Sequence, residues 1–137
     1  MYALSVDNDA KKDLADIKQV NQKAWALIVA FLEQAAADQD LLDRLSQNQY
    51  KDDDYHVSRW VQQWKEGRNI FRLKIACLTN MDATYRIIYA FDPSRAPQHY
   101  HVLGILPRSF NYDQNDSRTR RIEDAYKRLN VPKFGRR

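Results

Sequence analysis

Three apolar runs follow one another in the second half of the chain: NIFRLKIACL (69–78), TYRIIYAFDP (84–93) and HYHVLGILPRSFNYD (99–113). Each run is rich in Ile, Leu, Val, Phe and Tyr and is closed by turn residues, a pattern typical of an antiparallel meander of strands. Basic residues lie within the runs at Arg72, Lys74 and Arg86, and Arg108 follows the last one. A charged residue in a strand points away from its apolar neighbours. We therefore expect a small sheet with one buried face and with cations on the other.

The first half of the chain predicts mostly helix. Alternation at Tyr2–Val6 indicates a short first strand, and apolar residues then recur at helical spacing between residues 9 and 36. This periodicity predicts either an antiparallel helix pair or one long bent helix, with the break near Asn21. A short helix is expected around 41–45. The spacing of Val and Trp at 57–64 favours another helix, with a strand as the alternative.

A last helix is expected after Asp116 or Ser117, either of which can cap its start. Its apolar stripe ends at Leu129, and its other face is basic. The whole chain, 1–137, therefore predicts a single α+β domain. We expect a small twisted, antiparallel-rich sheet of about four strands, with the N-terminal helices on one face and the C-terminal helix in addition.

The composition excludes several classes of protein. Hydrophobic residues make up 44% of the chain and aromatic residues 12%, which argues against disorder. No apolar run approaches the ~20 residues of a membrane span, and the N-terminus lacks the pattern of a secretory signal. Cys77 is the single cysteine, so an internal disulfide is excluded, and a reducing cytoplasm is expected.

The net charge of +4 conceals a division between the two halves of the chain. Residues 1–55 hold 6 Lys and Arg against 11 Asp and Glu, whereas residues 56–137 hold 16 against 7. A basic half with interleaved aromatic residues is typical of proteins that bind a polyanion, nucleic acid above all. The alternative is a basic surface that is merely solvated.

Few motifs of known chemistry are present. The chain has three glycines and no glycine-rich phosphate loop, and it has no nucleophile elbow, so no cofactor is expected. His99 and His101 are two residues apart and would share one face of a strand. They suit a metal or acid–base role, or they form part of a solvated strand face.

The strand cations and Tyr112 offer one reaction, RNA cleavage without a metal. The 2′-OH of the RNA attacks the adjacent phosphate, which requires a base, cations for the growing charge and an acid for the leaving 5′-oxygen. Arginine suits the second task because its planar fork matches two phosphate oxygens. A lysine that is crowded by other cations has a lowered pKa and can act as a base.

The order of these residues resembles the RelE/ParE superfamily of bacterial toxins. The resemblance rests on FRLK (71–74), YRIIY (85–89), VLGILPR (102–108), Tyr112 and YKRL (126–129). It implies a toxin of a type II toxin–antitoxin pair. RelE-like members cut mRNA in the ribosomal A site without a metal, so the partners implied are mRNA, the ribosome and a cognate antitoxin, with no membrane.

The resemblance also implies residue roles. Lys74 falls at a strand lysine that acts as a base or charge stabiliser, and Arg86 at an arginine that clamps the phosphate. Arg108 would stabilise the transition state or aid protonation of the leaving group, and Tyr112 would stack on a base or orient the 2′-OH. Arg72 stands where ribosome-dependent members carry a second lysine. Because arginine is a poor proton carrier, His101 is the alternative base.

Two other functions remain open. ParE-like members inhibit DNA gyrase by binding it and lack the full set of cations and tyrosine, so the set present here favours the nuclease. A nucleic-acid-binding module without a reaction is the third possibility. Each residue also has a structural alternative: Arg86 pairs with Asp82 or Asp113, Tyr112 only closes its loop, and Lys74 is an ordinary outward strand residue.

Overall fold

A five-stranded mixed sheet forms the centre of the computed structural model, which describes residues 1–79 and 84–132. Its strand order is β1-β5-β4-β3-β2, and every neighbouring pair is antiparallel except β1 and β5, which are parallel. The strands are β1 (Tyr2–Val6), β2 (Tyr55–Arg59), β3 (Ile70–Ile75), β4 (Tyr85–Asp92) and β5 (Gln98–Pro107). The expected α+β class and the expected meander, β3-β4-β5, are thus confirmed.

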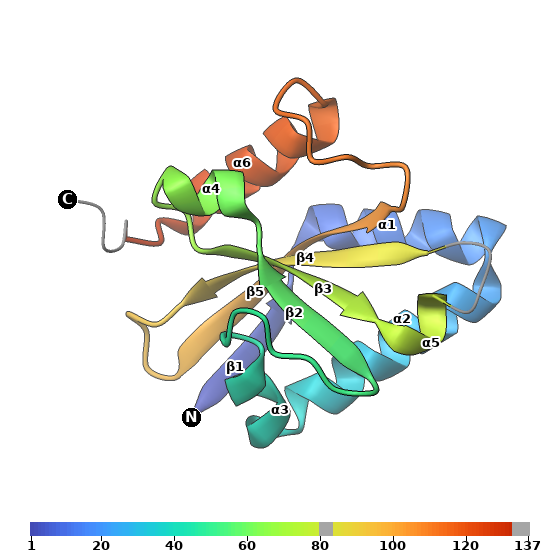
Figure 1. Ribbon diagram of the computed structural model, residues 1–137, viewed down its shortest axis with the longest axis horizontal. Helices are drawn as coiled ribbons and strands as arrows, with labels where there is room; N and C mark the ends of the chain where they lie inside the picture. Colours follow the sequence, from blue (N-terminus) through green and yellow to red (C-terminus); the bar gives the residue numbers. More distant parts are fainter. Residues whose placement is uncertain (80–83, 133–137) are drawn as a thin grey trace.

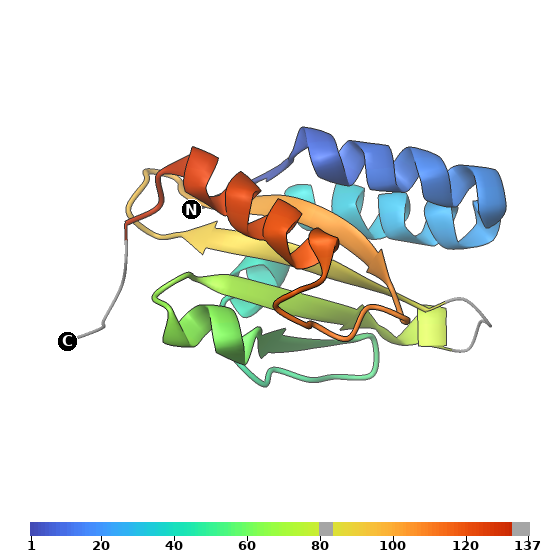
Figure 2. The ribbon, with the colours of Figure 1, turned by 90° about the horizontal axis from the view of Figure 1, so that it is seen from above.

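Helices lie on both sides of the sheet (Figure 1). They are α1 (Asn8–Val20), α2 (Gln22–Ala36), α3 (Gln39–Arg44), α4 (Val61–Lys65), α5 (Ala76–Thr79) and α6 (Ser117–Leu129). Figure 2 shows α1 and α2 as an antiparallel pair and α6 lying across the opposite side of the sheet. None of the helices in the described part of the chain is long and apolar enough to cross a membrane.

The predicted helix pair is confirmed, and the break falls at Asn21. Asn21 ends α1 and begins α2, because its side-chain oxygen accepts a hydrogen bond from the backbone N–H of Ala24 at 3.0 Å. Asp116 caps α6 in the same way, accepting from the backbone N–H of Arg118 at 2.8 Å. The cap at Asp116 was predicted from the sequence, whereas the break near Asn21 was predicted from the apolar spacing.

The expected helix at 57–64 is only half correct. Tyr55–Arg59 form the edge strand β2, which pairs with β3, and only Val61–Lys65 form a helix. The strand alternative therefore holds for the first half of this segment. Val57 is fully buried opposite Leu73, so burial against the neighbouring strand overrides the helical spacing.

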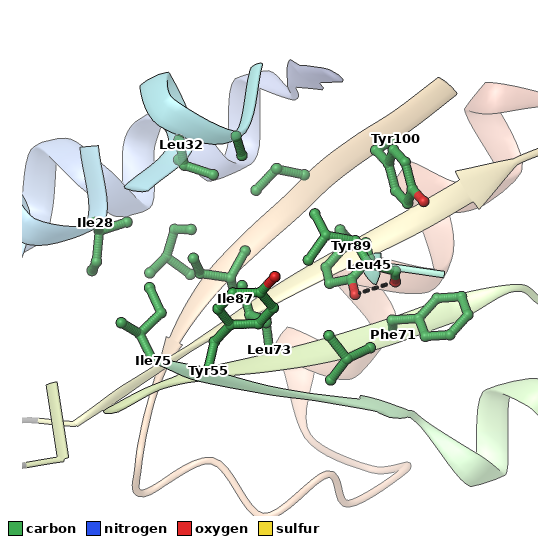
Figure 3. Packing of buried hydrophobic residues seen from close by; sticks show 14 of the residues in the cluster. Ile28, Leu32, Leu45, Tyr55, Phe71, Leu73, Ile75, Ile87, Tyr89 and Tyr100 are labelled. Carbon is green, nitrogen blue, oxygen red and sulfur yellow. Dashed lines mark hydrogen bonds between the residues drawn. The ribbon is translucent and has the colours of Figure 1, made fainter. Parts of the chain in front are cut away.

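Two apolar clusters pack on the two faces of the sheet. The larger joins α1, α2 and α3 to one face and includes Ile28, Leu73 and Tyr89 (Figure 3). The hydroxyl of buried Tyr89 donates to the carbonyl of Leu45 at 2.6 Å, which anchors the end of α3. The smaller cluster lies under α6 on the second face. The helices α4 and α6 therefore cover part of the face on which the cations were expected.

Both edges of the sheet are protected. The side chain of Gln39 accepts a hydrogen bond from the N–H of Tyr2 at 2.6 Å and donates to its carbonyl at 2.9 Å. At the other edge, Gln49 and Tyr50 exchange backbone hydrogen bonds with Val57 of β2. An open strand edge invites pairing with other chains, and these contacts occupy part of each edge.

Candidate functional site

A cleft of about 230 Å³ opens on the α6 side of the sheet, over strands β2, β3 and β4. Its lining residues are His56, Ser58, Arg72, Lys74, Arg86 and Tyr112. Four of these six were predicted as site residues from the sequence: Arg72, Lys74, Arg86 and Tyr112. The cleft therefore contains cations, a histidine, a hydroxyl group and an aromatic ring within one small volume.

The strand register explains why these side chains meet. His56 lies directly opposite Lys74, and Lys74 lies directly opposite Arg86. Residues that are directly opposite in an antiparallel pair project to the same face with their Cβ atoms about 4.5–5.5 Å apart. His56, Lys74 and Arg86 thus form one row that crosses three strands, and we call them the cationic row. Ser58 and Arg72 form a shorter second row beside it, in which the Arg72 Nε donates to the Ser58 Oγ at 3.0 Å.

The cationic row has no acidic counter-charge among the residues that the structure describes. Within residues 1–79 and 84–132, none of the ion pairs includes Lys74, Arg72 or Arg86. The Nη1 atom of Arg86 is buried and has no hydrogen-bond partner among the described residues. Like charges placed directly opposite each other destabilise a sheet, and a buried unpaired donor adds a desolvation cost. An anionic ligand would offset both costs.

The structural alternatives for Arg86 can now be compared with these contacts. Arg86 forms no ion pair with Asp113 among the described residues, and Asp82 lies outside them. Lys74 is exposed and forms one wall of the cleft. Both side chains are therefore placed where an anion in the cleft could contact them.

Tyr112 is held in place by aromatic contacts on the loop between β5 and α6. Its ring packs edge-on against Trp60 and Phe110 at centroid distances of 5.2 and 4.7 Å, and the Arg72 guanidinium lies 4.8 Å from its centre. Its φ angle is 63°, in the left-handed region that non-glycine residues rarely adopt. Its hydroxyl is buried without a hydrogen-bond partner among the described residues. Such conformations are common at functional sites, and the Tyr112 side chain also lines the cleft.

His56 is the site residue that sequence reasoning missed. Burial and the neighbouring charges of Lys51, Lys74 and Arg72 lower the pKa of its imidazole below the usual 6.5. The ring is therefore neutral near pH 7 and able to accept a proton. Its Nε2 lies 3.1 Å from the Gln49 Oε1, a contact that puts the proton on Nε2 and leaves the Nδ1 lone pair as the acceptor. Period-two alternation at residues 55–59 was the signal that could have placed His56 on the polar face of a strand.

Two predicted site residues do not line the cleft. Arg108 is exposed and follows β5, where its backbone N–H donates to the Thr84 carbonyl at 2.8 Å. His101 lies opposite Ala90, whereas Arg86 lies opposite Leu106 farther along β5. At about 3.3 Å per residue, His101 lies roughly 16 Å along β5 from Leu106, the residue opposite Arg86. The structure therefore does not bring His101 to the cationic row.

His101 belongs instead to a separate pair with His99. The two rings stack at a centroid distance of 4.3 Å, and both contact the Ser5 hydroxyl. Burial, together with His99 and Arg95, lowers the pKa of His101 to about 4. Across residues 1–79 and 84–132, no group of three or more His, Cys, Asp or Glu side chains is arranged to hold a metal ion.

Comparison with known proteins gives no relative for this chain: no family model, no curated protein and no solved structure matches it. The function must therefore be argued from the cleft itself.

Proposed function

We propose that this chain is a RelE-like toxin, an endonuclease that cleaves mRNA without a metal and thereby inhibits translation. The observation that carries the proposal is the cationic row, His56-Lys74-Arg86, which shares one cleft with Arg72 and Tyr112. Three cations without an ion pair among the described residues line this hollow and would attract a negatively charged phosphodiester, and an adjacent neutral imidazole supplies a base. The ribosome as the place of cleavage and a cognate antitoxin as the inhibitor are part of the proposal.

In the proposed reaction His56 removes the proton of the 2′-OH, and the 2′-oxygen attacks the adjacent phosphorus. The P–O2′ bond forms as the P–O5′ bond breaks, which leaves a 2′,3′-cyclic phosphate on the upstream fragment. Arg86 and Arg72 bind the non-bridging oxygens as their negative charge grows, because an arginine fork matches two such oxygens. The leaving 5′-oxygen takes a proton from Lys74, which lines the cleft.

This reading changes the roles that the resemblance implies. His56 replaces His101 as the base, because His56 lines the cleft with Lys74 and Arg86. Lys74 then serves as a charge stabiliser or acid and not as the base. Arg108 becomes a contributor to RNA binding outside the cleft, since its side chain is exposed beyond the end of β5.

The test compares Arg86→Ala with Arg108→Ala and with Arg120→Ala, an exposed arginine on α6 as the matched control. Loss of one preorganised donor to a developing charge costs about 10²–10³ in rate. We expect this loss for Arg86→Ala, no change for Arg120→Ala and a smaller effect for Arg108→Ala. The measurement is cleavage of mRNA on translating ribosomes and of free RNA, with mapping of 5′ ends and detection of the cyclic phosphate.

A substrate with a 2′-deoxy residue at the cut site should remain intact, because it lacks the nucleophile. Cleavage of that substrate, or full activity of the Arg86→Ala variant, would overturn the proposed mechanism. If the protein instead inhibits DNA supercoiling when it is present at one molecule per gyrase, and leaves RNA intact, a ParE-like gyrase inhibitor would be the function.

A further inference from the structure

A second hollow of about 260 Å³ adjoins the cleft at the edge of the sheet. It is lined by Lys51, Asp52, Tyr55, His56, Lys74 and Ala76. His56 and Lys74 line both hollows. Because these two residues are direct cross-strand partners, their side chains form a common wall with one hollow on each side.

The segment before β2 extends the cationic row by one residue. Lys51 pairs with His56 in an isolated antiparallel bridge on the outer side of β2. The complete row is then Lys51, His56, Lys74 and Arg86, across four adjacent backbone segments. With neighbouring segments about 4.8 Å apart, the backbones of Lys51 and Arg86 are roughly 14 Å apart. Lys51 lines the second hollow and Arg86 lines the cleft, so the two ends of the row are placed to contact different groups.

The one carboxylate in the second hollow already has partners. Asp52 accepts hydrogen bonds from the backbone N–H groups of Asp54 and Tyr55 at 2.8 and 3.0 Å, and from the Tyr50 hydroxyl at 2.9 Å. Its charge is therefore engaged in shaping the loop. Lys51 is exposed and forms no ion pair among the described residues, so its ammonium group is available to an anion.

We propose that the second hollow is a subsite for the nucleotide next to the cleaved bond. A single strand of RNA crosses the edge of the sheet, with the reacting phosphate in the cleft at Arg86 and the neighbouring phosphate at Lys51. The inference rests on the proposed function in taking RNA as the ligand. A single strand is required because in-line attack by a 2′-OH needs a backbone that is free to leave the A-form geometry of a duplex.

The experiment measures binding rather than cleavage. Fluorescence anisotropy would measure the binding of two fully 2′-O-methylated oligonucleotides, which cannot be cleaved because they lack a free 2′-OH. The dinucleotide has one phosphate, and the tetranucleotide has three. The variants are Lys51→Ala, Lys51→Arg and, as the matched control, Lys11→Ala on the exposed face of α1. Unfolding midpoints of all variants would be compared first to confirm that each is folded.

Lys51→Ala should weaken binding of the tetranucleotide several-fold and lower the slope of log K against log salt by about 0.7, the loss of one phosphate contact on a single strand. Binding of the dinucleotide should stay within twofold of the unsubstituted protein. Lys51→Arg should retain the affinity for the tetranucleotide, since it keeps the charge. Lys11→Ala should change none of these values.

Equal losses on the two oligonucleotides, or a Lys51→Ala variant that matches the Lys11→Ala control, would overturn the subsite. The outcome for the proposed function is separate. If the protein cleaves unmodified RNA but Lys51→Ala affects the dinucleotide and the tetranucleotide alike, only the subsite would be overturned. Length-dependent binding through Lys51 with no cleavage of RNA, on or off the ribosome, would overturn only the nuclease.

Discussion

Lys74 and Arg86 lie directly opposite each other on neighbouring strands, and no carboxylate pairs with either among the described residues. A cross-strand pair of like charges destabilises the pairing of the two strands. Burial, together with the charges of Lys51, Lys74 and Arg72, lowers the pKa of the neighbouring His56. In the proposed reaction Lys74 has two effects: it attracts the phosphate, and its charge helps to keep His56 unprotonated.

The first prediction concerns His56. In the proposed reaction only its neutral form removes the 2′-OH proton, so the cleavage rate should fall as the pH drops below the lowered pKa. Because burial and nearby cations shift this pKa downward from 6.5, the fall should begin below pH 6.5. His56→Gln should lose about 10²-fold or more in rate and should also lose this acidic fall. The measurement is the single-turnover rate of RNA cleavage between pH 5 and 8.

His99→Gln is the matched control, since His99 lies outside the cleft and its pKa is also lowered. It should keep the rate and the acidic fall of the unsubstituted protein. An acidic fall that persists in His56→Gln would show that another group is the base. Gln49→Ala should slow cleavage but keep the fall, because Gln49 orients the ring without accepting the proton.

At the scale of elements, Asp13 joins three of them. Its carboxylate accepts hydrogen bonds from the Arg121 Nη1 and Nη2 at 2.9 and 2.6 Å and from the backbone N–H of Ile105 at 2.9 Å. This contact ties α1 to α6 and to β5. Gly104 permits the close approach, because a Cβ at that position would lie 2.8 Å from both the Arg121 Nη2 and the Ile122 Cδ1. The position of α6, and with it the loop that carries Tyr112, depends on this junction.

The second prediction is that Asp13→Asn lowers the free energy of unfolding by about 1–3 kcal/mol, the usual loss when a charged hydrogen-bond partner is removed from a partly buried donor. The reason is that the Arg121 guanidinium, with 31% side-chain exposure, would lose its only carboxylate among the described residues. Urea denaturation measures the change as a shift in midpoint at constant slope.

Asp16→Asn on the same helix is the control, because Asp16 is exposed and takes part in none of the ion pairs within residues 1–79 and 84–132. It should change stability by less than about 0.5 kcal/mol. Equal midpoints for the two variants would contradict the structural role assigned to Asp13.

At the scale of the whole molecule, one sheet serves two cores. Strand β4 sends Ile87 and Tyr89 to the cluster beneath α2, and Ile88 and Ala90 to the cluster beneath α6. Because the same strands support both clusters, we expect the two clusters to unfold together. The parallel pairing of β1 with β5, which joins the first strand to the last, adds to this coupling.

The third prediction is that both faces unfold in one transition. Trp25 packs against the larger cluster and Trp60 is buried in the smaller. A variant with Trp25 as its single tryptophan and one with Trp60 as its single tryptophan would each report on one face. In each variant, tryptophan fluorescence and far-UV circular dichroism should give the same urea midpoint. Separate midpoints would show that the two faces unfold independently.

Local signals along the chain determined much of this protein. Alternation and turn residues predicted the meander, the Asn21 and Asp116 caps marked helix boundaries, and the placement of Arg72, Lys74 and Arg86 on strands predicted a shared cationic face. These features depend on neighbours in the sequence, and for that reason the sequence alone was sufficient.

Only the tertiary structure decided which residues share the cleft. Pairing of β2 with β3 brings His56 to Lys74, although 17 residues separate them along the chain, and the register of β5 keeps His101 away from Arg86. Strand order and register arise from pairing between distant segments and from burial on both faces of the sheet. A shift of one residue in either pairing would place a different set of side chains at the site.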